Sequence, residues 1–148
     1  MSFFALCLGR VLLALFFLIT VLHEVMNWGE VEQVLLTALT NWMNVYYNYP
    51  VITSFLIELS SWASILLAVG VGLKMIGGIF LAFGWYPRLG AFALILCLLP
   101  STFLLHDFWH LQGVQRQLHT FEFLKDMGLL GGLFIVLGAK SLIGKGSD

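Results

Sequence analysis

Four long apolar stretches dominate the sequence, at residues 3–25, 52–83, 89–105 and 121–139. A helix that crosses the hydrocarbon core of a membrane needs about 20 mainly apolar residues. Of the 148 residues, 60% are hydrophobic and only 10% are charged, whereas soluble domains have about 45–50% and about 25%. We therefore predict an all-α membrane protein with four transmembrane helices at these stretches, forming a single domain over residues 1–148.

The second stretch is longer than one span requires. A single helix over residues 52–83 would be about 48 Å long, whereas the hydrocarbon core is about 30 Å thick. No turn signal divides it into two. We therefore expect one helix that protrudes at its start, near Glu58, and bends near Gly70 or Gly72.

Residues 30–50 are too polar to cross a membrane, but their apolar residues recur at the three- and four-residue spacing of an amphipathic helix. Such a helix lies in the membrane interface with its apolar face down. We expect it between the first two spans, ending before Pro50. The apolar positions are Val31, Val34, Leu35, Ala38, Leu39, Trp42 and Tyr46.

Charge and cysteine usage exclude several classes of function. The formal net charge of −1 gives no basic field, so nucleic acid is not an expected partner, whereas membrane lipids are. Cys7 and Cys97 both lie in apolar runs, and no CxxC motif is present, which disfavours a disulfide mechanism.

Lysine and arginine residues predict the orientation in the membrane, because they accumulate on the cytoplasmic side. We expect both termini inside the cell, with the amphipathic helix and the polar region after the third span outside. This arrangement places four of the counted residues inside and two outside, namely Arg10, Arg88, Lys140 and Lys145 against Arg116 and Lys125.

A histidine pair follows the third span. His106 and His110 are four residues apart with Asp107 between them, so on a helix both rings share one face. This spacing suits two ligands of a transition metal with a carboxylate beside them. His23 and Glu24, at the end of the first span, lie on the same side and would complete the set. The alternative is that these polar residues only line the outer interface.

Lys74 is the most unusual charged residue. It lies ten residues before Gly84, hence about 15 Å deep and near the membrane midplane. A lysine there costs about 2.5–3.5 kcal/mol on insertion scales, so we predict a carboxylate beside it. The pair has a structural role, or forms a polar core that binds a headgroup, a quinone carbonyl or a proton. A second candidate pair is Glu122 with Lys125, three residues apart at the start of the fourth span.

Two motifs give the sequence a resemblance to the DoxX family of small bacterial inner-membrane proteins. The first is GGIFLAFGWYPRL at residues 77–89, which resembles the family's glycine-pair turn between spans two and three. The second is HDFW at 106–109, followed by Gln115 and Gln117 and by FLKD at 123–126. The resemblance implies four spans in a bacterial inner (plasma) membrane with both termini inside, and a link to quinone-linked or oxidative-stress redox systems.

Two positions depart from the pattern of that family. Lys74 stands where the family has an acid, and Asp126 stands where it has an uncharged amide. One exchange of charge across the interior explains both changes. We therefore predict that Lys74 forms a buried ion pair with Asp126.

Three functions are then open, and the resemblance favours the first. It is an accessory or scaffold subunit for a membrane redox partner protein, with a quinone as the candidate cofactor. The others are a small transporter or channel and a metal-dependent membrane enzyme that uses His106 and His110. An enzyme is less favoured because the sequence shows no nucleophile–base pair, phosphate loop or haem motif. The oligomeric state stays open.

Overall fold

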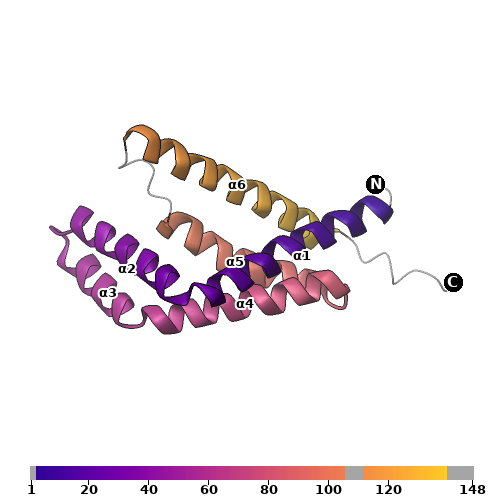
Figure 1. The fold of residues 1–148 in the computed structure, drawn as a ribbon, viewed down its shortest axis with the longest axis horizontal. Helices are drawn as coiled ribbons and strands as arrows, with labels where there is room; N and C mark the ends of the chain where they lie inside the picture. Colours follow the sequence, from indigo (N-terminus) through magenta and orange to yellow (C-terminus); the bar gives the residue numbers. More distant parts are fainter. Residues whose placement is uncertain (1–2, 106–111, 140–148) are drawn as a thin grey trace.

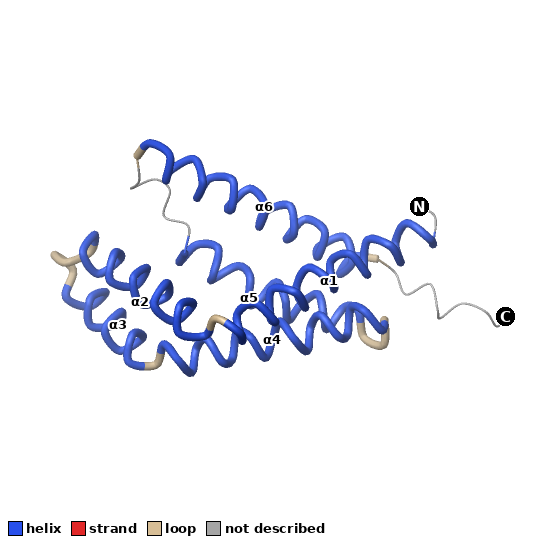
Figure 2. The backbone as a smooth tube through the Cα atoms, in the orientation of Figure 1, coloured by secondary structure: helices blue, strands red, loops and turns tan. Residues whose placement is uncertain are grey.

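The computed structural model describes residues 3–105 and 112–139, and every regular element in these ranges is a helix (Figure 2). The prediction of an all-helical chain is confirmed. The elements in chain order are α1 (Phe3–Met26), α2 (Trp28–Val45), α3 (Pro50–Ser61), α4 (Ala63–Phe83), α5 (Pro87–Leu105) and α6 (Gly113–Gly138).

Three helices, α1, α4 and α5, are long and apolar enough to cross a membrane. They coincide with the first predicted span, the end of the second and the third, and they indicate a membrane protein. The predicted fourth span is not among them. Instead, α6 begins at Gly113 rather than near Phe121, and its first half carries charged residues that lower its hydropathy.

Residues 52–83 do not form the single helix that we predicted. The helix breaks at Trp62, between α3 and α4, whereas Gly70 and Gly72 lie inside an unbroken α4. Side-chain hydrogen bonds accompany the break. The hydroxyls of Ser60 and Ser61 donate to the carbonyl of Ile57, and such local hydrogen bonds compete with the helix. The Trp62 indole donates in turn to Glu58, the residue that the sequence placed at a protruding helix start.

The predicted amphipathic helix is present as α2, but it does not stand alone. It packs against α3 as a helical hairpin, and its Leu39 is fully buried. Pro50 begins α3, and the Thr53 hydroxyl donates to the carbonyls of Tyr46 and Tyr49 in the connecting turn. The Trp42 indole donates to the Leu104 carbonyl at 3.0 Å, which ties the hairpin to the end of α5.

The four long helices run back and forth, so that the start of α1 and the end of α6 lie at one end and the α2–α3 hairpin at the other (Figure 1). Helix α4 packs along α1 and α5, and α6 packs along α5. The buried apolar core lies toward the end with the termini. Its residues are Ala14, Phe17, Leu81, Ala91, Leu94, Ile95, Leu98, Leu130, Leu133 and Val136.

Glycine lets α4 and α5 approach closely within this core. A Cβ atom added at Gly77 would lie 2.7 Å from the Leu94 Cγ and 3.0 Å from the Gly90 carbonyl oxygen. A Cβ atom at Gly90 would lie 2.8 Å from the Gly77 carbonyl oxygen. The two backbones therefore meet at a contact that no larger residue fits.

Two arginines lie at helix ends near the termini. The guanidinium of Arg10 lies against Gly84, which ends α4 with a left-handed φ of 70°. Arg88 donates to the Ala139 carbonyl at the end of α6, with Nη2 at 2.9 Å. Positive charge is favourable at a helix C-terminus, where carbonyl groups lack partners.

Candidate functional site

A buried ion pair joins α1 to α4. The Lys74 Nζ lies 2.5 Å from the Glu24 Oε1, and the two side chains are only 14% and 12% exposed. In a low-dielectric interior an unpaired charge is very costly, so each residue accounts for the burial of the other. The predicted carboxylate beside Lys74 is therefore present.

The predicted identity of that carboxylate is wrong: Lys74 pairs with Glu24 rather than with Asp126. Glu24 was predicted at the end of the first span as a candidate metal ligand. It lies in the last turns of α1, on a helical face that packs against α4, and this packing brings it to Lys74.

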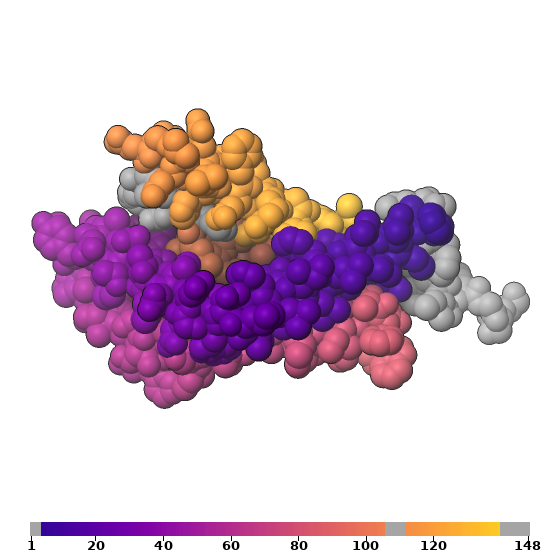
Figure 3. All heavy atoms as spheres, viewed as in Figure 1, coloured from indigo at the N-terminus to yellow at the C-terminus, as the bar shows by residue number. Residues whose placement is uncertain are grey.

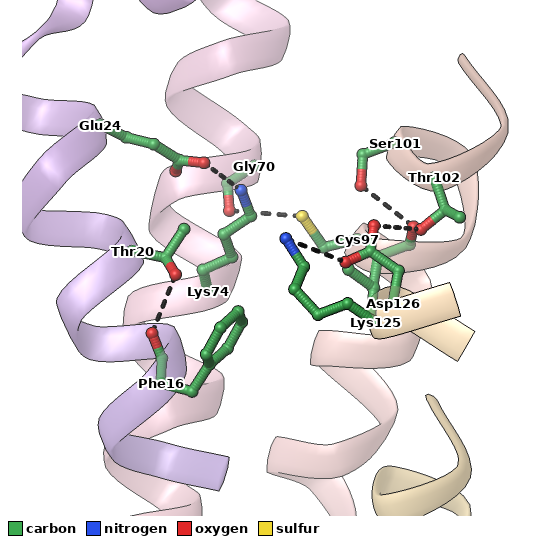
Figure 4. Close-up of polar contacts among 11 residues, drawn as sticks. Phe16, Thr20, Glu24, Gly70, Lys74, Cys97, Ser101, Thr102, Lys125 and Asp126 are labelled. Atoms are coloured by element: carbon green, nitrogen blue, oxygen red, sulfur yellow. Dashed lines mark hydrogen bonds and ion pairs between the residues drawn. The ribbon is translucent and has the colours of Figure 1, made fainter. Parts of the chain in front are cut away.

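That face of α1 carries Phe16, Thr20 and Glu24 at four-residue spacing, so the three side chains are stacked along the helix. The Thr20 hydroxyl donates to the Phe16 carbonyl at 2.9 Å. Lys125, from α6, reaches the same face, with its Nζ 6.0 Å from the centre of the Phe16 ring. Figure 4 shows Lys74 and Lys125 extending toward this face from different helices.

Asp126, the residue after Lys125 on α6, is 7% exposed. The Thr102 hydroxyl, fully buried in α5, donates to the Asp126 Oδ2 at 3.0 Å. The Lys125 Nζ lies 3.9 Å from the Asp126 Oδ1, which is an ion pair but too long for a hydrogen bond. We call the set Thr20, Glu24, Lys74, Thr102, Lys125 and Asp126 the interior polar site.

The interior polar site is balanced in charge but not in hydrogen bonds. Two carboxylates face two ammonium groups. The second carboxylate oxygen of Glu24, Oε2, is buried and has no hydrogen-bond partner among the described residues. Lys125 is about half exposed, at 52% of its side chain. A ligand that donates to Glu24 and accepts from Lys125 would use capacity that the described part of the protein leaves open.

A polar hollow of about 480 Å³ lies on the hairpin side of this site, between α2 and α6. In Figure 3, α5 is visible between α6 and the segment formed by α1 and α2. Gln115 and His119 line the hollow and lie on the same face of α6 as Asp126. The hollow therefore lies on the same face of α6 as Asp126, although no residue of the interior polar site lines it. Its lining is Glu30, Gln33, Val34, Thr37, Ala38 and Asn41 from α2, with Leu105, Gln115 and His119.

The remaining predicted site residues lie elsewhere or outside the described residues. His23 precedes Glu24 but is exposed, and Glu122 is exposed as well. Lys125 forms an ion pair with Asp126. The residues 106–110, with the predicted ligands His106, Asp107 and His110, lie outside the described residues. Within residues 3–105 and 112–139, no group of three or more histidine, cysteine or acidic residues is arranged to hold a metal ion.

Thr102 provides a test of the Asp126 environment. The substitution Thr102→Val keeps the side-chain shape but removes the donor to a buried carboxylate. We expect a loss of about 1.5–3 kcal/mol in the free energy of unfolding, as for hydrogen bonds to charged groups. Unfolding in mild detergent measures it. Thr102→Ser should restore most of the loss, and Thr40→Val, which removes an exposed hydroxyl bonded within α2, should cost much less. Equal losses for both valine variants would contradict a hydrogen bond to Asp126.

Comparison with known proteins corrects the resemblance drawn from the sequence. The family described as HR-like lesion-inducing matches residues 1–139, and no match to the DoxX family is found. The assignment to the DoxX family is therefore wrong. The accessory role in a redox system, which depended on that assignment, is wrong as well. The glycine pair and the HDFW and FLKD segments that suggested it are short, whereas the family match covers almost the whole chain. No curated protein matches the chain. No solved structure matches it either.

Proposed function

We propose that this chain, which belongs to the HR-like lesion-inducing family, is a four-span membrane protein that binds the polar headgroup of a membrane amphiphile at the interior polar site. The family description names the induction of lesions and specifies neither a ligand nor a reaction, so the chemistry rests on the residues. The observation that carries the proposal is the convergence of Glu24, Lys74 and Lys125 from three helices, with hydrogen-bonding capacity left open.

Energetics support a binding role over a purely structural one. Ionisable residues within a membrane bundle are costly and are usually functional. A buried ion pair adds little net stability, because the desolvation of both charges offsets their attraction. The apolar core and the glycine contact between α4 and α5 hold the bundle together at the other end, so the helices do not need the ion pair for their packing.

The position of the polar hollow supports access from the hairpin side. Its α6 lining, Gln115 and His119, is on the face that leads to Asp126. Exposed apolar side chains of α1, among them Leu12, Leu15 and Ile19, flank the site. A ligand with a polar head and apolar chains matches this combination of a polar interior and an apolar surround.

The proposal includes α6 as the fourth span, with both termini on the cytoplasmic side of a plasma membrane. The back-and-forth order of α1, α4, α5 and α6 supports it, since three of these helices already qualify as spans by length and hydropathy. Gln115 and His119, which line the hollow, and Asp126, which accepts from Thr102, account for part of its lower hydropathy.

Cysteine labelling tests this topology. Single cysteines at Asn44, Tyr86 and Gln115, each in a variant with Cys7 and Cys97 replaced by alanine, are treated with a membrane-impermeant maleimide on intact cells. We expect labelling at 44 and 115 and none at 86 until the membrane is permeabilised. Labelling of position 86 in intact cells would reverse the orientation. Labelling of 44 but not 115 would remove α6 from the spans.

Lipid retention tests the binding role. Purified protein is washed extensively in a mild detergent, and bound lipid is counted by native mass spectrometry. We expect about one lipid per chain for the wild type, and none for the double variant Glu24→Leu with Lys74→Leu, which removes the charges without stranding either one. Equal retention by the wild type and a folded double variant would refute the proposed function.

A further inference from the structure

We infer that the amphiphile carries a phosphoethanolamine headgroup, whose phosphate binds at Lys125 and whose primary ammonium binds at Glu24. The inference rests on the proposed function and specifies the chemistry of its ligand. It follows from charge, from hydrogen-bonding capacity and from the position of both groups beside one face of α1.

Charge balance favours a zwitterion. Glu24 and Asp126 offset Lys74 and Lys125, so the four charged groups of the interior polar site sum to zero. In a low-dielectric interior an added net charge is costly. A headgroup with one phosphate and one ammonium leaves the total unchanged, whereas an anionic headgroup such as phosphoglycerol would leave an excess of one negative charge.

The unpaired carboxylate oxygen of Glu24 favours a headgroup that carries an N–H donor. Its Oε2 is buried without a partner in the described part of the chain, and such an atom gains a full hydrogen bond when a donor arrives. A primary ammonium has three N–H donors and forms a charge-assisted bond to a carboxylate. A trimethylammonium group has none. Since the oxygen is shielded, binding includes a small rearrangement of the side chains around Glu24.

Lys125 is the group that we expect to bind the phosphate. It is half exposed, its contact with Asp126 is 3.9 Å long, and its ammonium lies beside the Phe16 ring. Its three N–H groups are therefore available to a phosphate oxygen. Phe16, beside Lys125, lies two helical turns from Glu24 on the same face of α1. Both ends of the proposed headgroup would therefore lie along one face of this helix.

A headgroup series tests the inference. Wild-type protein is titrated with phosphatidylethanolamine, phosphatidylcholine and phosphatidylglycerol of identical acyl chains in mixed micelles, and binding is followed by native mass spectrometry. We expect phosphatidylethanolamine to bind about tenfold more tightly than the other two, which corresponds to one charge-assisted hydrogen bond. Equal binding of the three lipids, or tighter binding of phosphatidylglycerol, would overturn the inference.

Two variants assign the ends of the headgroup. Glu24→Gln keeps an acceptor but removes the charge. It should bring the ratio of the affinities for phosphatidylethanolamine and phosphatidylcholine close to one. Lys125→Gln should weaken all three phospholipids by a similar factor and keep the preference. Arg116→Gln, which removes a positive charge from an exposed position on α6, is the matched control and should change neither. A preference that survives in Glu24→Gln would remove the ammonium from Glu24.

The outcomes separate the inference from the proposed function. Lipid that is retained by the wild type, lost from the Glu24→Leu, Lys74→Leu double variant and indifferent to headgroup supports the proposed function and overturns phosphoethanolamine. Retention that does not depend on the interior polar site overturns both. The selectivity of the wild type decides the question even if Glu24→Gln fails to fold.

Discussion

Replacement of Lys74 by leucine is expected to lower the free energy of unfolding by about 3–5 kcal/mol, because it leaves Glu24 as an uncompensated charge in the interior. Glu24→Leu should cost a similar amount for the converse reason. Both side chains are less than 15% exposed, so solvent screens the two charges only weakly. Reversible unfolding in a mild detergent at neutral pH measures the losses.

The double variant distinguishes a pair from two independent residues. Glu24→Leu combined with Lys74→Leu removes both charges and replaces them with apolar side chains of similar bulk, so it should recover most of the stability lost in either single variant. Arg116→Leu is the control, because that arginine is exposed on α6 and its loss should be far smaller. Strictly additive losses in the double variant would mean that the two residues do not interact.

Gly77→Ala should destabilise the bundle by about 1–3 kcal/mol, the usual range for an overpacked core. The added Cβ would lie 3.0 Å from the backbone carbonyl of Gly90, and backbone cannot move aside as a flexible side chain does. The cost exceeds the gain in helix propensity of about 0.5–1 kcal/mol that alanine brings over glycine in mid-helix.

Gly72→Ala is the matched control on the same helix. A Cβ atom there meets nothing within 4 Å, so the variant should be neutral or more stable. The difference in melting temperature between the two alanine variants isolates the contact between α4 and α5. Equal melting temperatures would show that these helices do not meet at Gly77.

Local sequence signals were sufficient for most of the helices. Apolar runs of the right length predicted α1 and α5 within two residues at each end, and the spacing of apolar residues predicted α2. The break at Trp62 was missed because tryptophan is not a breaker by itself. The available signal was the pair of serines at 60 and 61 and Glu58 four residues before the indole, whose side chains form hydrogen bonds at the junction.

The site was predictable in kind but not in its pairing. A lysine near the membrane midplane requires a carboxylate beside it, because an unpaired charge is costly in a low-dielectric interior. The choice of partner depended on which face of α1 packs against α4, which no local pattern specifies. Thr20 was detectable as a polar residue four positions before Glu24. Thr102 was not, because its hydroxyl matters only through its contact with Asp126 on another helix.

The most direct test of headgroup binding at the interior polar site is a nuclear distance measurement in bilayers. Protein labelled with 15N at the lysine Nζ is reconstituted in phosphatidylethanolamine, and dipolar dephasing of the 15N signals by lipid 31P is recorded by solid-state NMR. We expect strong dephasing for Lys125, whose Nζ would lie about 2.7–2.9 Å from a phosphate oxygen, and its disappearance in Lys125→Gln. Dephasing that is the same in the wild type and in Lys125→Gln would contradict a phosphate at this site.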